Sequence, residues 1–73
     1  MMEFQPGWRL VEGVWYVSMP FERAVRSLAN GEPVSVVDSR GSESWQVVTG
    51  FVEGSAGEYG VLCKVRNAPT PTK

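Results

Sequence analysis

The sequence predicts a small α+β domain, in which a four- or five-stranded antiparallel sheet carries one amphipathic helix in the order β(β)αβββ. Two observations lead to this fold class. Apolar residues alternate with polar ones before residue 19 and after residue 33, which is typical of strands. Between these stretches the apolar spacing changes to that of a helix. With 73 residues, the chain is expected to form one globular domain over residues 1–67.

The first strand region is "WRLVEGVWYVS", residues 8–18. Glu12 and Gly13 interrupt its apolar pattern. The segment is therefore either a hairpin that turns at these two residues or a single strand broken by a glycine bulge. We adopt the hairpin as the working interpretation.

The helix is predicted in "MPFERAVRSLANG", where four apolar residues recur at positions i, i+3, i+4 and i+7: Phe21, Ala24, Val25 and Leu28. Pro20 is suited to the first turn, and Asn30-Gly31 supplies a left-handed stop. We expect the four apolar residues to face the core. The helix would then cover an apolar sheet face that so small a sheet cannot bury alone.

Three further strands are predicted after the helix. Residues 34–37 precede the turn-rich "DSRGSES", and "WQVVTGFVE" contains Gly50, whose position suggests a bulge that re-phases Phe51. The last strand places Tyr59, Val61, Cys63 and Val65 on one apolar face. Residues 68–73 contain two prolines and no large apolar side chain, so we expect them to form a disordered tail.

The composition argues against catalysis. The chain has no histidine and one cysteine, so neither a zinc site nor a Ser–His or Cys–His pair can be assembled within it. Its carboxylates are scattered singly, and the glycines of "GFVEGSAGEYG" lack the lysine of a phosphate-binding loop. We therefore expect no enzyme activity, no cofactor and no metal.

The net charge and the absence of targeting signals indicate which cellular compartment and which kind of binding partner to expect. The net charge of −1 lacks the basic excess of a general nucleic-acid binder, so no direct nucleic-acid contact is expected. "MMEFQPGWRL" has neither the basic nor the apolar region of a signal peptide, and no apolar run is long enough to span a membrane. A single cysteine excludes an intramolecular disulfide. These features predict a cytoplasmic protein with no membrane partner.

Aromatic side chains are numerous for so small a core, and some are expected on the surface as a protein-binding patch. The first candidate patch is Phe4, Trp8 and Arg9. The alternative is that Trp8 and Trp15 complete the core. The helix face that carries Arg23 and Arg26 is the second candidate, although a charged helix face is commonly just solvated.

The helix "FERAVRSLANGEPV" with its glycine stop, followed by a meander, resembles the small accessory proteins that phages encode. From "MEFQPGWRLVEG" to "APTPTK" the chain resembles small phage transcription regulators that bind host RNA polymerase. This resemblance implies a monomer in the host bacterial cytoplasm that contacts the β and β′ subunits and displaces the σ factor. It would inhibit transcription initiation and also promote antitermination. No binding residue is implied.

A second resemblance is local. "MPFERAVRSLANGEPV" is similar to the "FEEAL…L..GK.V" pattern of another small phage-borne family, some members of which sequester nucleotide signals in anti-defence. The alternative function is therefore a module that sequesters a small nucleotide ligand.

Overall fold

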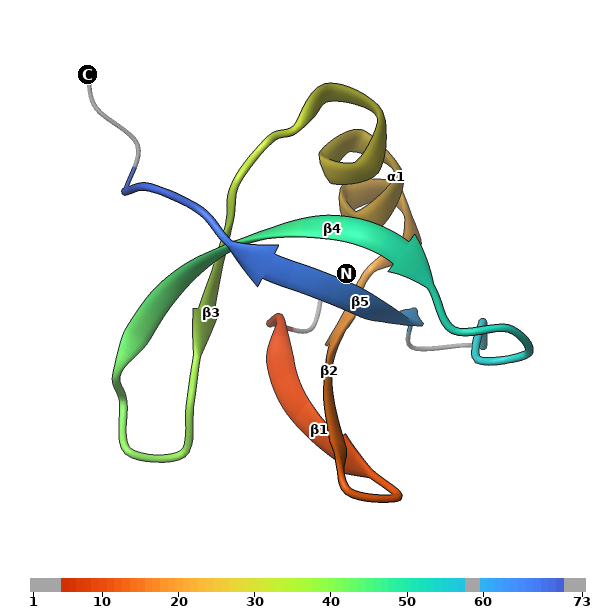
Figure 1. The fold of residues 1–73 in the computed structure, drawn as a ribbon, viewed down its shortest axis with the longest axis horizontal. Helices are drawn as coiled ribbons and strands as arrows, with labels where there is room; N and C mark the ends of the chain where they lie inside the picture. The colour runs from red at the N-terminus through yellow and green to blue at the C-terminus, as the bar shows by residue number, and fades with distance from the viewer. Residues whose placement is uncertain (1–4, 58–59, 71–73) are drawn as a thin grey trace.

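The computed structural model describes residues 5–57 and 60–70, and these form one sheet and one helix (Figure 1). The elements in chain order are β1 (Gly7–Val11), β2 (Val14–Met19), α1 (Phe21–Asn30), β3 (Val34–Val37), β4 (Glu43–Phe51) and β5 (Val61–Asn67). The predicted α+β class and the order ββαβββ are confirmed.

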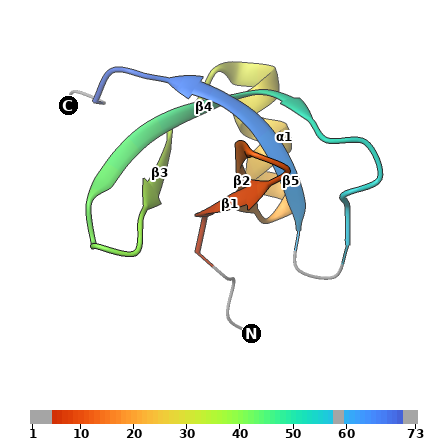
Figure 2. The ribbon, with the colours of Figure 1, turned by 60° about the horizontal axis from the view of Figure 1, so that its bottom comes forward.

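The sheet is antiparallel throughout, with the strand order β1-β2-β5-β4-β3. β1 and β3 are therefore its two edges. The sheet curves strongly, as Figures 1 and 2 show, and brings β1 near β3 without any hydrogen-bonded pairing between these two strands. The result is an open sheet whose two edge strands lie close to each other without pairing.

The first two strands form the predicted hairpin. Glu12 and Gly13 both have positive φ, 50° and 81°, as the two central residues of a type I′ turn do. Val11 pairs with Val14 across this turn. The turn thereby fixes the register of the other pairs in the hairpin, such as Leu10 with Trp15 and Trp8 with Val17.

The prediction that Phe21, Val25 and Leu28 face the core is wrong. Their exposed fractions are 52%, 40% and 44%, whereas Ala24 and Ser27 are completely buried. The helix is rotated so that its small residues face the sheet, and these let it approach β4 and β5 closely (Figure 2). The larger residues of the stripe lie at the boundary with solvent.

The core is built mainly from small and medium apolar residues on the inner face of the curved sheet. Its buried members are Val17, Met19, Ala24, Val34, Val36, Val48, Val61 and Cys63. The predicted bulge is confirmed between Val48 and Gly50, after which Phe51 pairs with Cys63 and packs against the core. The ring of Phe51 also meets Phe21, with 5.8 Å between centroids.

The predicted tail begins with one sheet-like contact. The N–H of Ala68 donates to the carbonyl of Trp45 at 2.9 Å, which extends the β4–β5 pairing by one residue. Pro69 and Thr70 are exposed and belong to no helix or strand. Residues 71–73 lie outside the described residues, and disorder of the tail stays a prediction.

Candidate functional site

The inner face of the β1–β2 hairpin continues beyond the core. Trp8 lies opposite Val17, and Leu10 lies opposite Trp15, so all four side chains share the face that lines the core. Val17 is completely buried, whereas Leu10 is 56% exposed and Trp15 is 57% exposed. The hairpin thus carries the apolar face past the point where the rest of the sheet can cover it.

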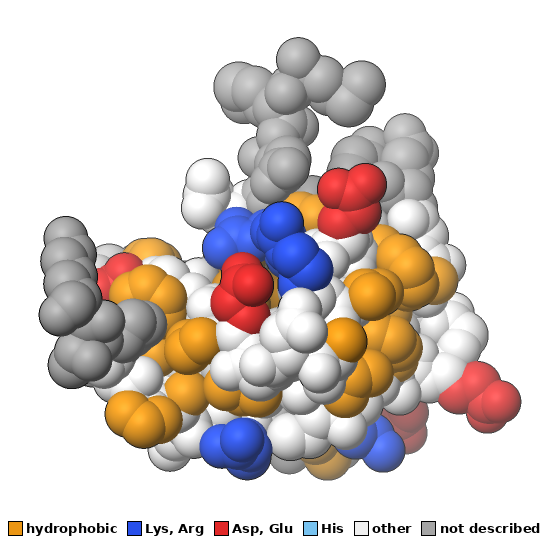
Figure 3. All heavy atoms as spheres, turned by 90° about the horizontal axis from the view of Figure 1, so that it is seen from above, with side chains coloured by type: hydrophobic (Ala, Val, Ile, Leu, Met, Phe, Trp, Pro, Cys, Tyr) orange, Lys and Arg blue, Asp and Glu red, His pale blue; other side chains and the backbone are white. Residues whose placement is uncertain are grey.

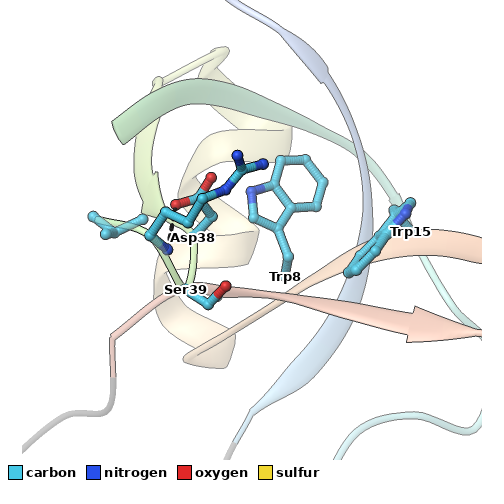
Figure 4. Close-up of a pocket in the computed structure, with 7 residues that line it drawn as sticks. Trp8, Trp15, Asp38 and Ser39 are labelled. Atoms are coloured by element: carbon cyan, nitrogen blue, oxygen red, sulfur yellow. Dashed lines mark hydrogen bonds between the residues drawn. The ribbon is translucent and has the colours of Figure 1, made fainter. Parts of the chain in front are cut away.

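A hollow of about 730 Å³ lies beside this uncovered face. It is lined by Gly7 and Trp8 of β1, Trp15 of β2 and residues 37–40 at the end of β3 and in the following loop. Figure 4 shows Trp8 standing between the loop that bears Asp38 and the ring of Trp15. The two indoles meet edge to face, with centroids 6.4 Å apart and planes at 89°. Two indoles in contact with each other therefore form an aromatic wall of the hollow.

The opposite wall is ordered by Asp38. Its Oδ1 accepts hydrogen bonds of 2.9 Å from the N–H of Arg40 and the N–H of Ser42. The N–H of Asp38 in turn donates to the carbonyl of Ser42 at 3.0 Å. The bond from Ser42, supported by the bond and charge of Arg40, lowers the pKa of the Asp38 carboxyl. Its charge thus holds the loop in a defined turn.

Of the first candidate patch, Phe4 lies outside the described residues. Trp8 and Arg9 are neighbours in β1, so their side chains point to opposite faces of the sheet. Trp8 is half-buried against the core and lines the aromatic hollow, whereas Arg9 is exposed and lines a second depression with Ser18 and Leu62. The structure therefore separates two residues that the sequence placed in one patch.

The second candidate surface is the helix. Arg23 is half-buried and Arg26 is exposed, and the Nε of Arg26 lies 3.9 Å from an Oε of Glu32. An exposed pair at this distance contributes little to stability. Figure 3, which looks onto the side of the molecule that carries α1, shows hydrophobic side chains on both sides of a central charged group. The helix side is therefore mixed in character.

Sequence reasoning missed Leu10 and Trp15 as parts of the site. The signal was present, because a turn at Glu12-Gly13 fixes Leu10 opposite Trp15 and puts both on the face of Val17. What the sequence did not reveal is that β5, although it continues to Asn67, separates from β2 beyond Val17 and leaves this part of the hairpin uncovered. β5 pairs with β2 only from Val17 onward.

The one cysteine and the acidic side chains bear on reactivity and on metal binding. Cys63 is completely buried, and burial raises the pKa of its thiol to about 11. Over residues 5–57 and 60–70, no group of three or more potential metal-binding side chains comes together. Within the same residues, no helix combines the length and apolar character needed to cross a membrane.

Comparison with protein-family models, with curated proteins and with solved structures finds no match to this chain. Function is therefore inferred from the geometry of the hollow and from the resemblance to small phage regulators.

Proposed function

We propose that this chain is a phage protein that binds host RNA polymerase stoichiometrically and inhibits transcription initiation by displacing the σ factor. The resemblance to small phage transcription regulators supports the partner, the β and β′ subunits, and also supports a role in antitermination. The chain acts as a monomer that occupies a surface, without covalent chemistry.

The observation that carries a protein-binding role is the uncovered apolar face of the β1–β2 hairpin. Trp15 and Leu10 are each more than half exposed although they lie on the core-facing side of their strands. Tryptophan at the centre of an interface contributes much of the binding free energy, because it buries a large area and loses little conformational entropy. The hollow beside Trp15 gives a partner side chain a place to insert.

Two transcription assays with purified bacterial RNA polymerase test this function. Displacement of σ predicts that the protein inhibits initiation from a promoter when it is added before σ and DNA. Elongation from a preformed complex should continue, because catalysis in the elongating enzyme does not need the σ-contact surface. Equal inhibition of both steps, or inhibition of neither, would reject the proposed function.

A small nucleotide is the second candidate ligand. Two indoles and Arg40 line the same hollow, and its volume lies in the range of small-ligand sites. An aromatic wall can stack a base, and a guanidinium can pair with a phosphate. This function predicts a rise in melting temperature with a cyclic or phosphorylated nucleotide, and a flat response across a nucleotide panel would remove it.

A further inference from the structure

The outer face of the sheet, which faces away from the core, carries three exposed basic side chains. These are Arg9 on β1 and Lys64 and Arg66 on β5. Arg9 follows Trp8 and the two β5 residues flank Val65, and both Trp8 and Val65 pack against the core. Because successive side chains of a strand point to opposite faces, all three cations share the outer face.

Strand pairing places these cations along one track across the sheet. Arg9 lies directly opposite Tyr16 of β2. The last pair of β2 with β5 is Val17 with Cys63. Tyr16 and Lys64 each stand one residue beyond that pair, so Tyr16 lies between two cations in the strand order.

The track ends at a second aromatic residue, on β4. Arg66 lies opposite Val47, and Trp45 lies two residues from Val47 on the same face. Lys64 lies opposite Gly50, and a Cβ on Gly50 would be 4.0 Å from the Cδ of Lys64, so the lysine stem lies over a residue without a side chain. From β1 to β4 the track therefore runs cation, ring, cation, cation, ring.

A depression of about 390 Å³ lies at the β1 end of this track. Arg9, Ser18 and Leu62 line it from three neighbouring strands. Ser18 and Leu62 are a directly opposed pair. The guanidinium of Arg9 thus has a recess beside it that a ligand group can enter.

The charge of this face differs from that of the whole chain. Glu43 is the one acidic residue within the five strands, and it accepts a hydrogen bond from the hydroxyl of Ser35. Among residues 5–57 and 60–70, none of the three cations of the track forms an ion pair. The net charge of −1, from which we expected no nucleic-acid contact, is an average over faces of unlike charge.

We propose that the outer face of the sheet binds a single strand of nucleic acid. Its phosphates pair with the three cations, and its bases stack on Tyr16 and Trp45, which are both half-buried. An acidic protein segment would match the cations but would leave the two rings unused. A duplex keeps its bases stacked on one another and away from side-chain rings. This inference goes beyond the proposed function, because polymerase is assigned to the opposite face of the hairpin.

Fluorescence anisotropy of a labelled oligouridylate of about twelve nucleotides, titrated with the full chain, tests this inference. Each phosphate contact on a single strand contributes about 0.7 to the slope of log Kd against log salt concentration. Three contacts therefore predict a slope of about 2. Absence of binding at about 0.1 mM protein in physiological salt, or a Kd that does not change with salt, would overturn the proposal.

Three competing probes test which ligand the face selects. Oligothymidylate should bind within about fivefold of oligouridylate, because phosphates and ring faces are common to both. A duplex of the same length and an oligoglutamate peptide should each bind at least about tenfold more weakly. Equal or tighter binding of the duplex or the peptide, or binding of only one of the two single strands, would overturn the proposal.

Substitutions on the track locate the site. The double variant Lys64→Ala/Arg66→Ala should lower the salt slope from about 2 to about 0.7. Tyr16→Leu keeps an apolar side chain but removes the ring, and should raise Kd at least about fivefold. The matched control is Arg26→Ala, which removes the same charge from α1 on the core side of the sheet and should change Kd less than about twofold.

Wild-type slope and affinity in the folded double variant would overturn the assignment of the site, as would an equal loss in Arg26→Ala. Circular dichroism checks that each variant is folded. If the double variant does not fold, the salt slope of the wild-type chain decides, and a slope below about 0.7 would overturn the track of three contacts.

Discussion

The hydroxyl of Ser27 on α1 accepts a hydrogen bond of 3.0 Å from the N–H of Val48 on β4. Both residues are buried. The pairing of β3 with β4 ends at Val34 and Gln46, so the next outward N–H of β4, that of Val48, lies beyond the reach of β3. The helix thus supplies the acceptor that the short edge strand does not.

Ser27→Ala should lower the free energy of unfolding by about 1–3 kcal/mol, because it leaves a buried N–H without an acceptor. Ser42→Ala is the matched control, since the hydrogen bonds recorded for Ser42 use its backbone. Urea unfolding of the two variants measures the difference. A loss for Ser27→Ala no larger than that of the control would mean that the bond does not stabilise the fold.

Leu28→Ala should cost less than about 1 kcal/mol, because the side chain is already 44% exposed. A buried leucine would cost about 2–5 kcal/mol. The matched comparison is Met19→Ala, whose side chain is completely buried and should show that larger loss. Thermal unfolding of both variants measures the two losses. If Leu28→Ala proved as destabilising as Met19→Ala, the observed orientation of the helix would be contradicted.

Cys63 should make stability depend on pH in the alkaline range. Its pKa is raised by burial from 9.0 to about 11, so the folded protein holds this proton while the unfolded chain loses it. The thiol's contribution to stability is therefore present below pH 9 and is lost as the pH rises toward 11. Urea unfolding of the wild type and Cys63→Ala between pH 8 and 11 measures this contribution by difference. Parallel pH profiles for the two proteins would contradict the prediction.

Much of the fold follows from local patterns in the sequence. The two turn residues Glu12 and Gly13 determine the hairpin, and Gly50 marks the bulge that turns Phe51 inward. Such features depend on neighbours along the chain, and period-two alternation identifies the strand faces without knowledge of the tertiary structure.

The orientation of the helix could not be predicted in the same way. The stripe of Phe21, Val25 and Leu28 indicates an apolar face, but the position next to the sheet is taken by Ala24 and Ser27, which permit a closer approach. Which face of the helix meets the sheet depends on the space between them and on the N–H of Val48, which bonds to Ser27 and not to a neighbouring strand. Likewise, the exposure of Trp15 follows from where β5 leaves β2, which the alternation pattern does not contain.

Binding of RNA polymerase by the uncovered hairpin face is tested by the affinity of Trp15→Ala for the core enzyme. Phe21→Ala is the matched control, because Phe21 is also aromatic and about half exposed but lies on α1. Trp8→Ala is less suitable, since Trp8 also packs against the core. Truncation of a tryptophan at the centre of an interface lowers the binding free energy by about 2 kcal/mol, which raises Kd roughly 30-fold. We expect this loss for a folded Trp15→Ala and near wild-type binding for Phe21→Ala. Equal affinities of Trp15→Ala and the wild type would contradict binding through the hairpin face.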